Sequence, residues 1–212
     1  MLFSSRQILP PSLYPPLHWG LKTLFPDGLW ELPADPHTQR VALTFDDGPH
    51  PEYTPALLQV LMDFQVSATF FVLGERVQRW PHLARQIRQQ GHRIGLHGWQ
   101  HRPFTELAPG ELYQSLKRSQ TTLVAACGGI PDDCPVMWSV VPEDWLIPPV
   151  SVVVERVLAQ VRPGSLIVLH DGVQGGAQVV EVTRQLIPTL KKRGFEFVHL
   201  PDPWDLSSQG ES

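Results

Sequence analysis

The chain has 212 residues, 42% hydrophobic and 18% charged, so it is long enough to bury a core and is typical of one globular domain. Its 17 basic and 21 acidic residues give a net charge of -4, which argues against binding to nucleic acid or an anionic membrane through bulk charge. Without a run of about 18 consecutive apolar residues, the sequence also argues against a membrane-spanning helix. Cys127 and Cys134 lack a C-x-x-C partner and are predicted to be ordinary thiols, with a disulfide closing a small loop as the alternative.

Residues 1–38 are predicted to form a proline-rich lead-in to the main body, which spans residues 39–203 and precedes a polar tail at 204–212. The lead-in is expected to pack three aromatic side chains onto the body: Trp19, Phe25 and Trp30. Prolines interrupt the first twenty residues, so the unbroken apolar core of a signal peptide is missing. On this basis we expect a soluble, cytoplasmic protein, with an extracytoplasmic location as the alternative.

Short β-rich runs then alternate with stretches of helical periodicity. The predicted strands are Val41–Phe45, Ala68–Val72, Arg93–Leu96, Val136–Val140, Ser165–Leu169 and Phe195–His199. The predicted helices are Thr54–Phe64, Glu75–Gln90, Pro109–Ala126, Val150–Val161 and Gln178–Arg193. Short strands that alternate with longer helices indicate βα units and a parallel sheet, so the fold class is α/β.

Side chains able to bind metal or transfer protons follow successive predicted strands. They are Asp46, Asp47, His97, Asp144 and His170. In parallel βα architectures the carboxyl ends of the strands meet at one edge, where function gathers. We therefore expect these side chains to lie on one rim of the fold.

The adjacent carboxylates of Asp46 and Asp47 end a buried strand, where burial costs several kcal/mol unless a cation lies nearby. An Asp-rich turn is the simplest alternative. His97 and His101 stand four residues apart, a spacing that lets two imidazoles bind one divalent ion if the segment makes one helical turn. Two His and one carboxylate leave coordination positions open for water and substrate. Together the two pairs predict a catalytic metal site.

Four motifs in order carry a family resemblance: TFDDGP, HGWQH, the EDW of WSVVPEDW, and GSLIVLHDG. From about Val41 to Leu200 the chain resembles the polysaccharide deacetylases with a NodB-type catalytic domain, carbohydrate esterase family 4. The resemblance implies a distorted, incomplete (β/α) barrel. It also implies a metal-dependent hydrolase that removes N-acetyl, or less commonly O-acetyl, groups from an acetylated carbohydrate. The implied ion is zinc, with cobalt or nickel as alternatives.

The same resemblance assigns a role to each matching residue. Asp46 is implied as the general base and His170 as the general acid, while Asp144 orients His170 and raises its pKa. The implied metal ligands are Asp47, His97 and His101. Trp145 is implied to line the pocket for the acetyl methyl group, with Val168 as a further apolar contact.

Three departures from the family pattern stand out. Gly98 replaces the usual Ser or Thr after the first His, and Val168 replaces a Leu. Only CGGIPDDCP, Cys127 to Pro135, fills the place of an Arg-Pro-Pro-Tyr-like motif, and no Arg occurs between Arg118 and Arg156. A missing Arg and backbone donor would weaken or abolish turnover. Two alternatives therefore stay open: an inactive relative that binds metal and carbohydrate, and an amidase acting on small amides.

Overall fold

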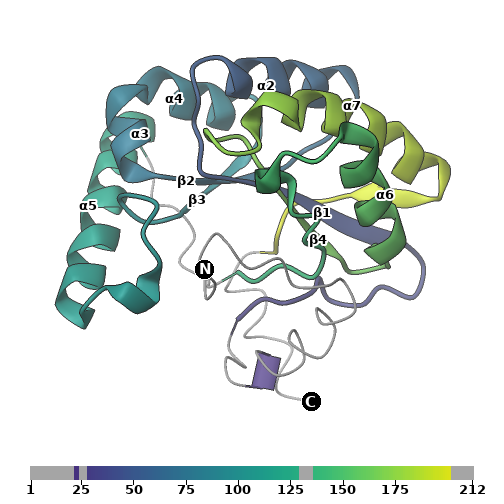
Figure 1. The fold of residues 1–212 in the computed structure, drawn as a ribbon, viewed down its shortest axis with the longest axis horizontal. Coiled ribbons are helices and arrows are strands. Elements are labelled where there is room, and N and C mark those ends of the chain that lie inside the picture. The colour runs from purple at the N-terminus through teal and green to yellow at the C-terminus, as the bar shows by residue number, and fades with distance from the viewer. Residues whose placement is uncertain (1–21, 24–27, 129–135, 202–212) are drawn as a thin grey trace.

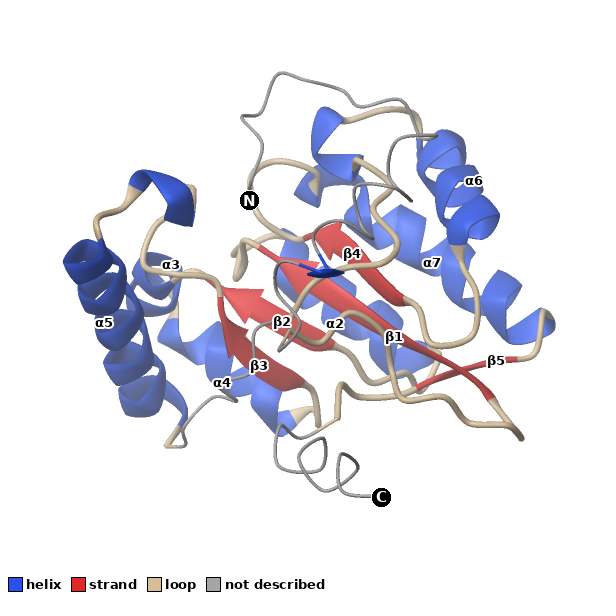
Figure 2. Ribbon diagram, turned by 90° about the horizontal axis from the view of Figure 1, so that it is seen from below, coloured by secondary structure: helices blue, strands red, loops and turns tan. Residues whose placement is uncertain are grey.

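The computed structural model of the protein describes residues 22–23, 28–128 and 136–201. At its centre lies a five-stranded parallel sheet in the order β3-β2-β1-β4, with β5 paired to the start of β1 (Figures 1 and 2). The strands are β1 (Gln39–Asp46), β2 (Thr69–Val72), β3 (Arg93–Leu96), β4 (Leu166–His170) and β5 (Phe195–Phe197). The sheet is open, as expected for an incomplete (β/α) barrel.

Six α-helices accompany the sheet in the described part of the chain. They are α2 (Tyr53–Asp63), α3 (Gly74–Arg79), α4 (Pro81–Gln89), α5 (Pro109–Cys127), α6 (Val150–Gln160) and α7 (Gly176–Lys192). Two short 3-10 turns complete them: η2 (Phe104–Glu106) and η3 (Asp144–Leu146). Figure 2 shows α2, α4 and α7 behind the sheet, with α5 and α6 at its two sides. None of the described helices combines the length and apolar character needed to cross a bilayer.

The sheet forms around the central strand β1, which is deeply buried. Its residues from Val41 to Asp46 are all buried, and before its acidic end the run is apolar except for Thr44, whose hydroxyl donates to the Ile167 carbonyl at 3.0 Å. The ring of Phe45 packs at a tilt against that of Phe70 in β2, with 5.1 Å between centroids. Burial of such a strand is the main source of stabilisation, and it also fixes where β1 ends.

The predicted helix at Glu75–Gln90 is two helices, α3 and α4, so that prediction was wrong about continuity. The break falls at Trp80, whose φ of -132° and ψ of 61° are not helical. Pro81 follows directly, and proline disfavours the helical conformation in the residue before it. Pro81 then opens α4, where its missing N–H costs nothing.

The predicted strand at Val136–Val140 was also wrong, because only isolated bridges form there: Val136 with Leu29, and Val140 with Ile167. The backbone N–H groups of Ser139 and Val140 both donate to the carbonyl of Leu166, at 3.1 and 3.0 Å. The Val168 N–H donates back to the Val140 carbonyl at 3.1 Å, which makes a single bridge to β4 and not a regular ladder. The segment crosses the edge of β4 without extending the sheet.

Part of the predicted lead-in lies within the described residues. Leu29, Trp30 and Leu32 are buried, so the stretch just before β1 packs onto the body. The expected contacts of Trp19 and Phe25 lie outside the described residues, as does the tail at 204–212.

Candidate active site

The register of the sheet brings the strand ends to one level. Asp46, the last residue of β1, pairs with Phe71 of β2 on one side and with His170 of β4 on the other. On β3 the last residue is Leu96, so His97 starts the loop at the same rim. The chemistry-bearing side chains thus converge at the carboxyl edge of the sheet.

The turn after β1 places both adjacent carboxylates on one side. In a continuing strand, neighbouring side chains point to opposite faces. Asp47 leaves the strand in the left-handed conformation, with φ at 69°. As a result His97 Nε2 lies 3.4 Å from Asp47 Oδ1 and 3.7 Å from Asp46 Oδ2. The left-handed turn converts an alternating pair into a convergent one.

Asp47, His97 and His101 have the geometry of a metal site. Asp47 Oδ1 lies 3.4 Å from the Nε2 atoms of both His97 and His101, and the three ligand atoms all lie within 4.8 Å of one another. Ligands at ~2.1 Å from a tetrahedral ion are separated by about 3.4 Å, so this set fits a zinc-like ion. Asp47 is buried whereas His101 is exposed, which leaves the solvent side open.

The protonation state of His97 suits this role. Burial lowers the pKa of His97 to about 4, although Asp47 acts in the opposite direction. The imidazole is therefore neutral at physiological pH, which is the form that donates a lone pair to a metal.

The segment that carries the two His is an irregular loop and not the helical turn that was considered from their spacing. Gly98 has φ at 91°, which side-chain-bearing residues rarely adopt, and a Cβ there would lie 3.1 Å from the Phe104 ring. The loop is held instead from α5: Ser115 Oγ accepts a hydrogen bond from the Trp99 N–H at 2.9 Å, and Arg118 lies 3.5 Å over the Trp99 ring. This explains glycine where Ser or Thr is usual.

A second group, His170 with Asp144, faces the cluster. The Nδ1 atom of His170 lies 2.8 Å from Asp144 Oδ1, and the His170 backbone N–H donates to Asp144 Oδ2 at 2.8 Å. Burial alone lowers the pKa of His170, but the charge and hydrogen bond of Asp144, with Asp46 and Asp47, raise it to about 9. The Nε2 atom of His170 is buried without a hydrogen-bond partner, so its hydrogen-bonding capacity is not used within the described residues.

Asp46 is 0% exposed, and neither of its carboxylate oxygens has a hydrogen-bond partner. Burial raises the pKa of Asp46 well above its ordinary value; His170 opposes this, and the nearby carboxylates add to it. No Arg or Lys among the described residues forms an ion pair with Asp46. The expected departure from the family pattern at Cys127 to Pro135 falls mostly on residues 129–135, which include Cys134 and lie outside the described residues. Cys127 carries a free thiol.

The two predicted substrate contacts differ in position. The Trp145 ring meets His170 edge-to-face, with 5.1 Å between centroids, and remains partly exposed beside the site. Val168 is 2% exposed within β4, so it contacts the core beneath the rim.

Sequence reasoning missed two residues close to this site, Asp171 and Thr54, which are both fully buried and share a hydrogen bond of 2.5 Å. An acidic residue directly after the strand-end His of GSLIVLHDG was the available signal for Asp171. Thr54 gave none, because a Thr near the start of a helix is common.

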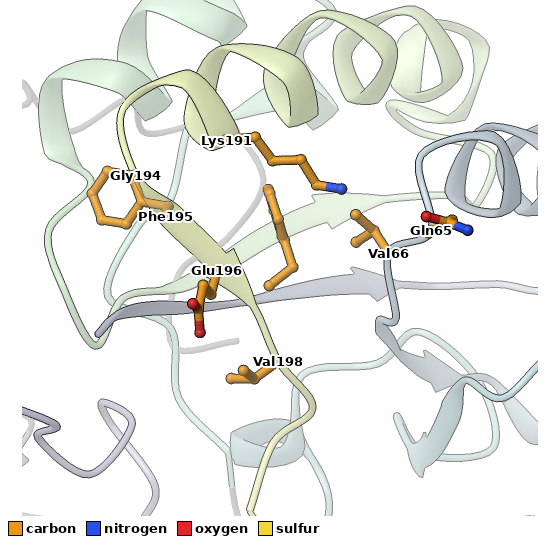
Figure 3. A pocket seen from close by; sticks show the side chains of 8 residues that line it. Gln65, Val66, Lys191, Gly194, Phe195, Glu196 and Val198 are labelled. Atoms are coloured by element: carbon orange, nitrogen blue, oxygen red, sulfur yellow. The ribbon is translucent and has the colours of Figure 1, made fainter. Parts of the chain in front are cut away.

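A separate hollow lies away from these groups. This open hollow beside β5 has a volume of about 490 Å³. Lys191 and Glu196 are among its lining residues, whose side chains are drawn in Figure 3. β5 pairs with the amino-terminal half of β1, so this cavity is at the end of the strand opposite to Asp46. The Lys191 ammonium donates to the carbonyl of Phe64 at 2.6 Å. The cavity contains none of the acid–base or ligand groups described above.

An open parallel α/β sheet with an Asp-His-His cluster and a His-Asp pair at its carboxyl rim is typical of metal-dependent hydrolases. The family model described as polysaccharide deacetylase matches residues 34–133. The chain belongs to the polysaccharide deacetylase family, as its curated relatives also show.

Two curated relatives are similar over most of their length. A peptidoglycan-N-acetylglucosamine deacetylase of Bacillus cereus is 33% identical over 201 residues, covering 84% of this chain and 93% of the relative. A chitooligosaccharide deacetylase of Bradyrhizobium sp. is 34% identical over 200 residues, covering 77% of this chain and 90% of the relative.

Solved structures agree with the fold. A peptidoglycan N-acetylglucosamine deacetylase superimposes with a TM-score of 0.77 at 29% identity, covering 84% of this chain and 94% of that chain. A family 4 acetyl xylan esterase from Clostridium thermocellum, solved with a cobalt ion, gives a TM-score of 0.73 at 29% identity, covering 80% and 92%.

Proposed function

We propose that this protein is a metal-dependent deacetylase that hydrolyses the N-acetyl group of N-acetylglucosamine residues in a polysaccharide or oligosaccharide. The observation that carries the proposal is the convergence of Asp47, His97 and His101 beside Asp46 and the His170 side chain, with Asp47 Oδ1 lying 3.4 Å from the Nε2 atom of each His. The names of the relatives support the substrate class, since they act on peptidoglycan and chitooligosaccharide.

Asp47, His97 and His101 would hold the ion, for which zinc is favoured by two imidazoles, one carboxylate and the tetrahedral spacing. A bound divalent ion supplies positive charge that polarises the amide carbonyl, activates water and keeps the neighbouring carboxylate ionised. Asp46 then accepts the proton of the attacking water as the new C–O bond forms. Its place beside Asp47, with both oxygens unpartnered, leaves a lone pair available for that proton.

His170 would donate the second proton. When the C–N bond breaks, the nitrogen needs a proton because an amide anion is a poor leaving group. With its pKa raised to about 9, His170 is protonated at neutral pH, and its unpartnered Nε2 carries the available proton. Acetate and a free amine are the products. The dependence of amide cleavage on such an acid favours N-acetyl over O-acetyl substrates.

Acetate release tests this function. With zinc present, the purified protein is expected to release acetate and an equal amount of free amine from chitooligosaccharides or peptidoglycan fragments, and a chelator is expected to stop both. Absence of acetate from both substrates with zinc, cobalt and nickel would contradict deacetylation. Release from simple amides alone would indicate the amidase alternative.

Metal binding gives a separate prediction. At 100 times its dissociation constant, zinc is expected to raise the melting temperature of the protein by about 5 to 10 °C. The His101→Ala variant should lose most of this shift, because it removes one of three ligands from an exposed position where folding is little affected. The matched control His82→Ala changes another exposed His, on α4, and should keep the full shift. Equal shifts in both variants would exclude His101 as a ligand.

A further inference from the structure

Asp171 is a buried acidic residue for which the proposed reaction has no use. It follows His170 at the end of β4 and is fully buried. Its Oδ2 accepts a hydrogen bond from Thr54 Oγ1 at 2.5 Å, whereas its Oδ1 has no hydrogen-bond partner. Burial raises the pKa of Asp171 to about 7, while the Thr54 hydroxyl and Arg76 lower it. Burying a carboxyl group with an unpartnered oxygen costs free energy, so the position of Asp171 needs a structural or functional explanation.

The Asp171 side chain lies directly against the turn that carries the two adjacent acids. A Cβ built on Gly48 would come within 2.5 Å of both Asp171 carboxylate oxygens. A Cβ built on Gly172 would lie 2.5 Å from Asp47 Cβ, and the Asp171 N–H donates to the Asp46 carbonyl at 3.1 Å. The loops after β1 and β4 therefore touch at three successive points, with glycine where the approach is closest.

This turn needs external support. Asp47 is held in the left-handed conformation, which side-chain-bearing residues adopt at a cost in energy and which persists only when its surroundings enforce it. The same conformation aims the Asp47 carboxylate at His97 and His101. Whatever holds the turn in place thereby holds a metal ligand.

Thr54 connects the two sides of this arrangement. Its hydroxyl oxygen accepts a hydrogen bond from the His50 N–H at 2.7 Å, and its single hydroxyl proton is donated to Asp171. The backbone N–H of Thr54 donates in turn to the His50 carbonyl at 3.1 Å, at the start of α2. The hydroxyl thus ties the loop after β1 to the end of β4, across 117 positions of sequence.

We propose that Thr54 and Asp171 form a clamp that positions the Asp46–Asp47 turn for metal binding. Both are positioning residues, since neither is among the ligand groups. The inference rests on the metal site of the proposed function and goes further by assigning two residues outside it. Changing such outer hydrogen-bonding partners lowers metal affinity by about 10- to 100-fold in metalloproteins.

The test is zinc affinity, measured by competition with a chromophoric chelator on the full chain. The Thr54→Val variant keeps the side-chain shape but removes the hydroxyl, and we expect its zinc dissociation constant to rise about 10-fold or more. Thr54→Ser restores the hydroxyl and should return affinity to near that of the wild type. Thr183→Val is the matched control: Thr183 is also fully buried, on α7, and its hydroxyl has no hydrogen-bond partner.

A merely structural role would give a different result. General destabilisation would lower the melting temperatures of the metal-free and zinc-loaded forms together, whereas a lost clamp should also shrink the difference between them. If Thr54→Val does not fold, Asp171→Asn provides the same measurement. Zinc affinity within 2-fold of wild type in the folded variant would overturn the clamp. Zinc binding by the wild type without acetate release would overturn the proposed function alone.

Discussion

The Asp46→Asn variant is expected to lose activity by about 10²- to 10⁴-fold, the contribution usual for a general base. The amide that replaces the carboxylate cannot accept a proton from water at neutral pH. Zinc should still bind, because Asp46 is not one of the three clustered ligand groups. The measurement is acetate release with zinc content determined on the same sample, so that loss of chemistry is separated from loss of metal.

The same substitution should stabilise the metal-free protein. The folded-state pKa of Asp46 is raised, so the folded protein loses stability as pH rises above the unfolded value of 3.8, where the unfolded carboxyl ionises first. Asn carries no such charge, and the metal-free variant should melt at a higher temperature than wild type at pH 7. Asp63→Asn, at an exposed site on α2, is the control and should change neither quantity. Full activity in the Asp46→Asn variant would show that Asp46 is not the general base.

The Asp144→Asn variant is expected to lower activity at pH 8 by about 10-fold and to move the alkaline limb of the pH profile. His170 must be protonated to act as the acid, and in the wild type its pKa of about 9 sets that limb. Without the Asp144 charge, burial dominates and the pKa falls, so the limb should shift to lower pH by about 2 units. The profile of kcat/KM against pH measures this directly.

The stability of the folded protein should also depend on the protonation of His170. Because the folded pKa of His170 is raised above its unfolded value of 6.5, its contribution is fully present below pH 6.5 and is lost as pH rises through about 9. In the Asp144→Asn variant this loss should disappear from the curve of melting temperature against pH. An unchanged alkaline limb would show that another group supplies the proton. Glu143→Gln, the neighbouring carboxylate that pairs with Arg156 at 3.1 Å, separates loss of local structure from loss of the acid.

The sequence predicted the fold class well because its strongest signals are local. The buried part of β1 is apolar apart from Thr44, and the helical stretches repeat their apolar residues at helical spacing, so strand and helix identity need little tertiary information. The errors fall where a neighbour overrides the pattern. Trp80 ends α3 because of Pro81, and Val136–Val140 makes only isolated bridges, with two of its N–H groups sharing the carbonyl of Leu166.

The candidate site likewise has features that could be predicted from the sequence and features that depend on tertiary contacts. Strand ends carry their polar residues in the sequence itself, so the approach of His97 to the Asp46–Asp47 pair could be predicted from a parallel sheet. The addition of His101 came from its spacing to His97, and the choice of Asp47 as the ligand came from the family resemblance. The role of Gly98 could not be predicted from the sequence. Its φ is 91°, and a Cβ at this position would lie close to the ring of Phe104 in the same loop. Asp171 and Thr54 were missed for a similar reason, because their hydrogen bond joins loops that are far apart along the chain.

By itself, then, the sequence determined which residues end the strands, and therefore which chemistry reaches the rim, because burial of apolar runs sets strand position. Only the tertiary structure decided that both acids point to the same side. That direction depends on the left-handed Asp47, whose unfavourable backbone is stabilised by contacts with β2 and with the loop after β4.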